Sequence, residues 1–215
     1  MQAYYAPEPR WPAWLATVAI AAILRTLPSA LIVGPDWLVF VLMVALTTVG
    51  SIVHARGKLL AAQNIGYAAL SIATLAMVAS LATLIYRLPT HAESPRELLL
   101  AATALWSSNI LIFACWYWRL DAGGPRHRDL RESHTDGAFL FPQMTISVKM
   151  RQELQEVQWR PTFIDYLFIA FNTSTAFSPT DAPVLSPWAK ILMMIQSSVS
   201  LTTLAILAAR AVNIL

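Results

Sequence analysis

Five long, mostly apolar runs constrain this chain more than any other feature of its sequence. A helix needs about 20 such residues to cross the hydrocarbon core of a bilayer. We assign five runs as membrane spans: Trp11–Val33, Trp37–Val53, Leu59–Ile85, Leu98–Trp118 and Ile191–Leu215. Lipid offers the backbone no hydrogen-bond partners, so a span of this length must be helical. The sequence therefore predicts an all-α, polytopic transmembrane helical bundle with five clear spans.

Composition agrees with a membrane protein and excludes several other classes. The chain is 57% hydrophobic and 13% charged, whereas soluble domains carry about 25% charged residues. Its net charge is only +3 with scattered basic residues, so we expect the lipid bilayer, and no nucleic acid, as a partner. The single cysteine, Cys115, excludes an internal disulfide and a multi-cysteine metal site. No basic segment precedes the first run, which we expect to be retained as an anchor.

A sixth apolar segment, Phe163–Phe177, differs from the five spans. Its 15 residues would rise about 22 Å as a helix, which is less than a hydrocarbon core of about 30 Å. It also carries a polar stretch in its second half: Asn172, Thr173, Ser174 and Thr175. We expect a short helix that is buried in protein and that either crosses the membrane or re-enters it.

The spans and loops divide the chain into three regions. Residues 1–119 form a four-span transmembrane region, residues 120–161 form a polar loop, and residues 162–215 form a carboxy-terminal module. Within the loop, the charges between Val148 and Val157 favour a short solvated helix.

The basic residues are predicted to lie mainly on one side of the membrane. If the first four spans all cross, one side holds Arg10, Arg56, Lys58, Arg119, Arg126, Arg128, Arg131, Lys149, Arg151 and Arg160. The other side holds Arg87 and Arg96. The positive-inside rule then places the amino terminus and the long loop in the cytoplasm. A crossing sixth segment gives six spans with both termini inside, whereas a re-entrant one gives five spans and an external carboxy terminus.

The carboxy-terminal module contains the most specific pattern in the chain. From Phe163 to Val212 it reads FIDYLFIAFNTSTAFSPTDAPVLSPWAKILMMIQSSVSLTTLAILAARAV. This resembles the pore helix, selectivity filter and inner helix of bacterial potassium channels. Laid without gaps, TAFSPTD (175–181) falls on the family's TTVGYGD, Ser186, Pro187 and Lys190 fall on a Ser-Pro and a basic residue, and Ser200 falls on a hinge glycine. The resemblance implies a homo-oligomer, since a path of this kind is enclosed by four copies.

The filter-like segment departs from that family at its glycines. Ser178 and Thr180 stand at the glycine positions, with Pro179 between them. A potassium filter lines its path with backbone carbonyls, in conformations that glycine permits, whereas proline fixes φ near about −65°. The filter is therefore degenerate, and potassium selectivity is not expected. Two alternatives remain possible: a hydroxyl-lined path through Thr173, Thr175, Ser178 and Thr180, or a closed remnant with no path.

The whole chain also resembles an uncharacterised bacterial family of polytopic membrane proteins. The matching residues are an aromatic segment, Asp165-Tyr166-Leu167-Phe168, and a tail, Ala211-Val212-Asn213-Ile214-Leu215. This resemblance implies a multi-pass protein of the bacterial inner (plasma) membrane and supplies no function.

Several polar residues lie within or beside the predicted spans. Arg25 is either a functional intramembrane charge, paired with Asp165 or Asp36, or a side chain that reaches the interface. Asp181 either sits at the pore mouth or forms a turn before Pro183. One face of the last helix carries Gln196, Ser200, Thr203, Leu207 and Arg210. This face either lines a vestibule or packs against other helices.

The only metal or acid–base candidates are loop residues: His91, Glu93, His127, His134 and Asp136. They show no ligand spacing, so we expect solvated loops, no metal, no cofactor and no enzyme. The leading expectation is an oligomeric ion or small-solute channel. The alternative is a non-conducting structural or interaction protein, and the weakest reading is a membrane enzyme that uses His127 or His134.

Overall fold

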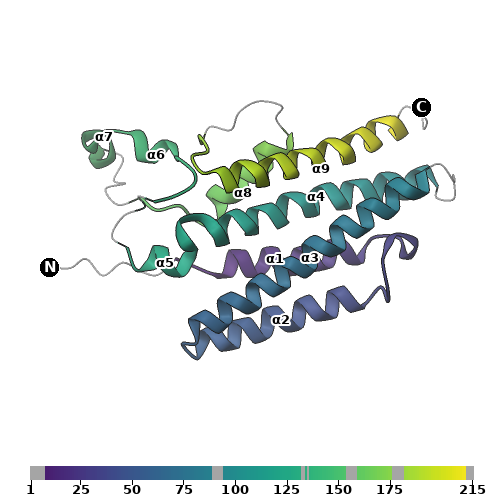
Figure 1. The fold of residues 1–215 in the computed structure, drawn as a ribbon, viewed down its shortest axis with the longest axis horizontal. Helices are drawn as coiled ribbons and strands as arrows, with labels where there is room; N and C mark the ends of the chain where they lie inside the picture. The colour runs from purple at the N-terminus through teal and green to yellow at the C-terminus, as the bar shows by residue number, and fades with distance from the viewer. Residues whose placement is uncertain are drawn as a thin grey trace.

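The computed structural model describes residues 8–88, 94–131, 134, 136–153, 159–175 and 182–211. Its described residues form an all-α bundle, as predicted (Figure 1). Four helices are long and apolar enough to cross a membrane: α2 (Leu38–Ala55), α3 (Leu59–Arg87), α4 (Pro95–Leu120) and α9 (Pro187–Ala211). The chain is therefore an integral membrane protein with four candidate spans in place of the predicted five.

The predicted first span, Trp11–Val33, is wrong beyond Arg25. Helix α1 (Trp11–Arg25) ends there, and the chain continues into a short 3₁₀ helix, η1 (Ser29–Leu31). The proline between them, Pro28, has no N–H to donate and disfavours helical backbone at the preceding residue. The 15 residues of α1 rise about 22 Å. α1 is thus an apolar helix shorter than a bilayer core.

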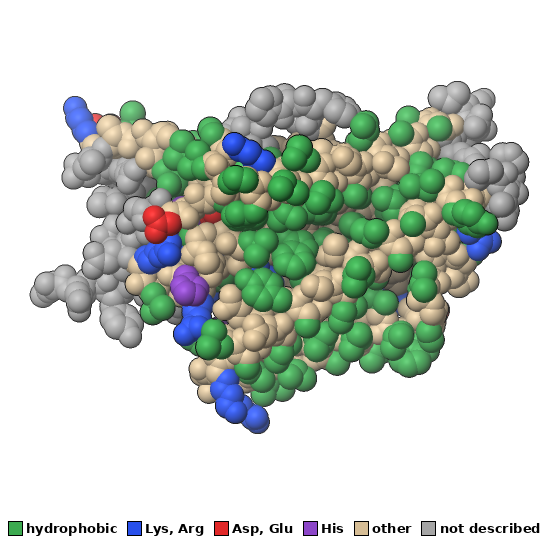
Figure 2. All heavy atoms as spheres, in the orientation of Figure 1, with side chains coloured by type: hydrophobic (Ala, Val, Ile, Leu, Met, Phe, Trp, Pro, Cys, Tyr) green, Lys and Arg blue, Asp and Glu red, His purple; other side chains and the backbone are tan. Residues whose placement is uncertain are grey.

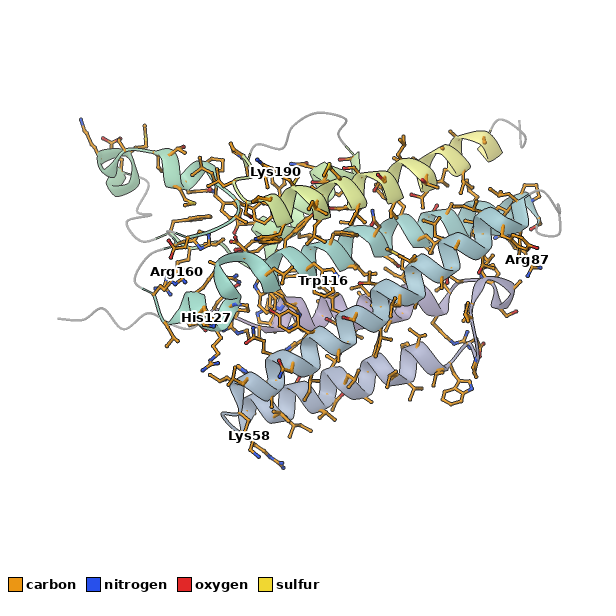
Figure 3. The ribbon with its side chains drawn as sticks, in the orientation of Figure 1. Lys58, Arg87, Trp116, His127, Arg160 and Lys190 are labelled. Atoms are coloured by element: carbon orange, nitrogen blue, oxygen red, sulfur yellow. The ribbon has the colours of Figure 1, made fainter. Side chains whose placement is uncertain are left out.

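Helices α1 to α4 reverse direction one after another, which gives the bundle two ends (Figure 1). We call one the loop end, because the described part of residues 121–153 lies there beside the starts of α1 and α3; the other is the far end. Figure 3 shows Lys58, His127 and Arg160 at the loop end and Arg87 at the far end. At the far end, Arg87 donates a hydrogen bond of 3.0 Å to the carbonyl of Ala30. Which end faces the cytoplasm stays a prediction.

Helix α4 is the central element of the bundle. In its 18-residue apolar stretch, 61% of the residues are buried, against 6% in that of α2. Helices α1, α3, α8 and α9 all pack against α4 (Figure 1). A capping box starts the helix: the Glu97 N–H donates to the Ser94 hydroxyl, and the Ser94 N–H donates to the Glu97 carboxylate at 2.9 Å. α4 therefore provides the surface on which the polar clusters below are built.

The long loop carries four short elements: η3 (Asp121–Gly123), α5 (Pro125–Asp129), α6 (Pro142–Thr145) and α7 (Val148–Glu153). Helix α7 falls within the segment for which the sequence predicts a short helix. Gly124, with φ of +85°, joins η3 to α5, and a Cβ there would lie 2.6 Å from the Arg119 carbonyl oxygen. Only glycine fits this close turn, which folds the loop back onto the end of α4.

Helix α8 (Phe163–Thr175) and α9 both begin at the loop end. The Phe139 ring contacts Tyr166 near the start of α8 and Trp188 near the start of α9, with centroids 6.2 and 6.3 Å apart. Near the end of α8, the Ala170 carbonyl accepts a hydrogen bond from Gln196, midway along α9. The 13 residues of α8 thus run parallel to the first half of α9 and stop short of the far end.

Candidate functional site

The filter-like residues are only partly described. Thr173 is buried and donates to the Ile169 carbonyl at 2.8 Å, and Thr175 is exposed and donates to the Phe171 carbonyl at 2.9 Å. Both hydroxyls therefore bond to the preceding turn of their own helix. Ser178, Pro179, Thr180 and Asp181 lie outside the described residues.

The Gln196 side chain is fully buried between α4, α8 and α9. Its Nε2 donates to the Ala170 carbonyl at 2.7 Å and to the Ser174 hydroxyl at 2.8 Å. Its Oε1 accepts a 2.6 Å hydrogen bond from the Tyr117 hydroxyl on α4. One amide thus joins three helices and uses both its N–H groups and its oxygen within a single chain.

A second buried amide, that of Asn109, lies on α4 about two turns before Tyr117. Asn109 donates from Nδ2 to the Gln196 carbonyl at 3.2 Å and to the Ser200 hydroxyl at 2.8 Å. Thr203 in turn donates to the Ser200 carbonyl at 2.9 Å. Ser200 and Thr203 are 2% and 0% exposed. We call Asn109, Tyr117, Ser174, Gln196, Ser200 and Thr203 the interior network.

The interior network contains most of the α9 face that the sequence singles out. Gln196, Ser200 and Thr203 do share one face, as their spacing predicts, and that face points toward α4 and α8. The side chain of Arg210 lies outside the described part of the chain. The exposed large hydrophobic residues of α9 lie away from this face: Ile191, Met194, Ile195 and Leu201. Lys190, near the start of α9, is also exposed.

A second polar cluster closes the loop end, and the sequence did not reveal it. Arg128 donates to the Glu8 carboxylate at 2.9 Å and to the backbone carbonyls of Trp118 and Asp121, each at 2.9 Å. Its side chain is only 4% exposed. The Trp118 indole N–H also donates to Glu8. This arginine therefore ties the amino-terminal segment to the end of α4.

The Asp121 carboxylate is completely buried in the same cluster. It accepts hydrogen bonds from the Tyr166 hydroxyl, at 2.6 Å, and from the Ala138 N–H. His134 Nε2 lies 3.2 Å from the same carboxylate. The expectation that His134 is a solvated loop residue is wrong, because its side chain is 3% exposed. Asp121 thus holds the loop and the start of α8 against α4.

Arg10 and Asp129 belong to the same cluster. We call the whole set the loop-end cluster; it consists of Glu8, Arg10, Trp118, Asp121, Arg128, Asp129, His134 and Tyr166. Arg10 pairs with Asp129 and lies 3.5 Å from Glu8. Burial lowers the pKa of Arg10, and the charges of Asp129 and Glu8 oppose this shift. The pairs are separated by about 120 positions in sequence, so no local motif announces them.

Two cavities lie at the loop end. One of about 20 Å³ is lined by Glu8, Arg128, Asp129, Arg131, His134, Arg160 and Pro161, which is room for about one water. The other, of about 250 Å³, is lined by Phe141, Pro142, Gln143, Ile164, Asp165, Phe168, Ile169 and Ala182. Among the described residues, no group of three His, Cys, Asp or Glu side chains could hold a metal ion.

The two predicted intramembrane charges lie at helix ends. Arg25 is the last residue of α1, and its guanidinium lies 3.1 Å from the Asp36 carboxylate, with both side chains nearly half exposed. A cation there also complements the helix dipole. Asp165 accepts from the N–H and the hydroxyl of Thr162, at 2.7 and 2.9 Å, and so caps the start of α8. The predicted span Trp11–Val33 would place Arg25 inside the membrane-crossing helix, which is wrong because the helix ends at this residue.

Comparison with known proteins finds no match: no protein-family model, no curated protein and no solved structure is significantly similar to this chain.

Proposed function

We propose that this chain is a non-conducting structural or interaction protein of the bacterial inner membrane, built on a channel-like fold. The observation that carries the proposal is the interior network. The polar side chains that would line a vestibule on α9 are hydrogen-bonded to α4 and α8 of the same chain instead. Of the described polar side chains on that helix face, Gln196, Ser200 and Thr203 are all buried and hydrogen-bonded within the chain, so they are not free to line a pathway between copies.

The orientation of α9 supports the same conclusion for an oligomer. Assembling several copies around an axis would bring together surfaces that are exposed in the single chain. Apart from Lys190 near its start, the exposed large residues of α9 are apolar, and Figure 2 shows hydrophobic side chains along this helix; Ile164, Phe168 and Phe171 on α8 are exposed as well. Such surfaces suit lipid or a neighbouring apolar helix, whereas ions need polar groups that replace their hydration shell.

In this proposal, α8 is a re-entrant helix that serves as a structural element. It starts beside α9 at the loop end, runs parallel to it and ends midway. Non-helical backbone at membrane depth is tolerated only where protein or water surrounds it. The amide of Gln196 bonds the Ala170 carbonyl and the Ser174 hydroxyl near the end of α8, which supports this role. The loop end would face the cytoplasm, the carboxy terminus would lie outside, and we propose no enzymatic activity.

An oligomeric channel is the second candidate, and one observation favours it. A short helix that ends at exposed Thr175 and lies parallel to a long helix is the arrangement implied by the potassium-channel resemblance. In that case Asp181 and the residues before it, rather than the α9 face, would form the constriction.

Ion flux into liposomes containing the purified protein separates the two candidates. We expect K⁺, Na⁺ and Cl⁻ flux no greater than that of protein-free liposomes. Flux that is abolished by Asp181→Ala, and retained in the matched variant Asp136→Ala in the long loop, would overturn the non-conducting proposal.

A further inference from the structure

Three arginines lie close to the Trp118 ring, and Arg119 is the one that has no carboxylate as an ion-pair partner among the described residues. Three guanidiniums approach the Trp118 ring: those of Arg10, Arg119 and Arg128, at 5.7, 5.5 and 5.9 Å from its centroid. Arg10 pairs with Asp129, and Arg128 pairs with Glu8. No described carboxylate lies within ion-pair distance of the Arg119 guanidinium, whereas Arg10 and Arg128 each have such a partner.

The Arg119 side chain lies in a niche that the sequence of α3 creates. Its guanidinium occupies the space beside Gly66 where any other residue would place its Cβ, and a methyl group there would overlap Nη1, Cζ and Nη2. The backbone beneath is fixed as well. The Gln63 amide donates to the Tyr67 hydroxyl at 3.2 Å, which donates to the Arg119 carbonyl at 3.1 Å. The guanidinium therefore packs against Gly66 between α3 and α4, and the Arg119 backbone is bonded to Tyr67 of α3.

The niche lies at the depth where lipid headgroups are expected. Arg119 is the second-last residue of α4, a candidate span, at the loop end. Beside it, Tyr67 and Trp116 stack with ring centroids 6.2 Å apart, and Figure 3 shows Trp116 where α4 passes α3. Aromatic side chains of this kind are enriched at the interface between hydrocarbon and water. At such an interface the partly exposed Arg119 would lie at the level of the headgroup phosphates.

From these observations we propose that Arg119, seated against Gly66, binds the phosphate of an anionic phospholipid headgroup. A planar guanidinium donates two parallel hydrogen bonds to a phosphate, and basic niches between helices near the cytoplasmic surface are suited to anionic lipids. The bound phosphate is then the direct ion-pair partner that no described carboxylate provides for Arg119. This site is independent of whether the chain conducts ions.

The test measures the thermal unfolding of the full chain in neutral detergent during titration with phosphatidylglycerol. The protein is also titrated with phosphatidylcholine and with inorganic phosphate. We expect phosphatidylglycerol to raise the Tm, and the two other probes to raise it much less at the same concentration. Arg119→Gln is expected to weaken the apparent affinity for phosphatidylglycerol about tenfold, the loss of one charge-assisted interaction.

Two further variants keep the test decisive. Gly66→Ala retains the arginine but displaces its guanidinium, so it is expected to weaken binding as Arg119→Gln does. Lys58→Gln removes an exposed cation at the same end of the bundle and is expected to leave the affinity within about twofold, since exposed charges contribute little. Arg119→Lys keeps the charge and is expected to retain part of the affinity.

Three results would overturn the proposal. The first is an unchanged phosphatidylglycerol affinity in Arg119→Gln. The second is an equal loss in Lys58→Gln, which would indicate general surface electrostatics. The third is an equal shift with inorganic phosphate, which would make the ligand a free anion rather than a lipid.

Discussion

The two polar clusters on α4 use different chemistry at different depths of the bundle. The interior network consists of amides and hydroxyls without a formal charge, and its members sit among apolar helices. The loop-end cluster consists mainly of arginines and carboxylates, at the boundary where α4 meets the loop. Charges are costly in hydrocarbon, whereas a neutral hydrogen-bonded pair is tolerated there. Among the described residues, the ion pairs of the loop-end cluster thus lie at the end of the bundle, whereas neutral hydrogen bonds join the helices in its interior.

The clusters also hold different parts of the chain together. The interior network joins α4, α8 and α9, which lie side by side along the bundle. The loop-end cluster joins segments that are far apart in sequence, namely the residues before α1, the end of α4 and the loop. We therefore expect the first to fix helix packing and the second to fix the fold of the loop end.

The largest expected effect is the loss of the central arginine of the loop-end cluster. Arg128→Met removes the partner of the buried Glu8 carboxylate and the donor to two backbone carbonyls. Breaking a buried ion pair from one side costs about 3–5 kcal/mol, and we expect about 3 kcal/mol in the free energy of unfolding, measured by denaturant titration in detergent. Lys149→Met, an exposed cation in α7, is the control. Equal stability of the two variants would contradict the assigned role of Arg128.

A smaller effect is expected at the centre of the interior network. Gln196→Leu leaves the Tyr117 hydroxyl, the Ala170 carbonyl and the Ser174 hydroxyl without their partner. Each unsatisfied buried group costs about 1–3 kcal/mol, but a lipid-embedded chain partly finds other partners, so we expect about 2 kcal/mol. The same denaturant titration measures it. A loss close to zero would indicate that α8 is held by apolar packing alone.

The single hydrogen bond between Tyr117 and Gln196 should be weaker still. Tyr117→Phe keeps the ring contacts with Phe113 and Phe139 and removes only the hydroxyl. A double-mutant cycle with Gln196→Leu is expected to give a coupling energy of about 0.6 kcal/mol, the average for interhelical hydrogen bonds in membranes. Additive effects of the two substitutions would show that this bond contributes nothing to stability.

The smallest effect is expected for a hydroxyl on the opposite face of α9. Ser198 is exposed and donates to the Met194 carbonyl of its own helix at 2.9 Å. Ser198→Ala is expected to change the free energy of unfolding by less than about 0.5 kcal/mol. A loss as large as that of Gln196→Leu would remove the distinction between the two faces of α9.

The sequence predicts the features that depend on local pattern. Apolar runs locate α2, α3, α4 and α9, because a span must satisfy its backbone within one helix. Helical periodicity also places Gln196, Ser200 and Thr203 on one face. It does not say what that face meets, because lipid, a pore and another helix are all compatible with the same spacing.

The features that the sequence did not predict depend on contacts between distant residues. The loop-end cluster pairs residues about 120 positions apart, and no spacing rule relates Glu8 to Arg128. Asp121 offered a weak signal, since a carboxylate directly after a long apolar helix must either reach water or find donors. Pro28 does indicate that α1 ends early. The prediction of the first span rests instead on the length of the apolar run, which continues past this proline.

The central claim, that the polar face of α9 points into the protein rather than into a water-filled path, is tested most directly by cysteine accessibility. In a Cys115→Ala background, Ser200→Cys is treated with a membrane-impermeant thiol reagent in native membranes, from each side separately. Lys58→Cys, in an exposed turn, reports that the reagent works. We predict rapid labelling at position 58 from one side and none at position 200 from either side. Labelling of Ser200→Cys at a rate comparable to that of Lys58→Cys would contradict the claim.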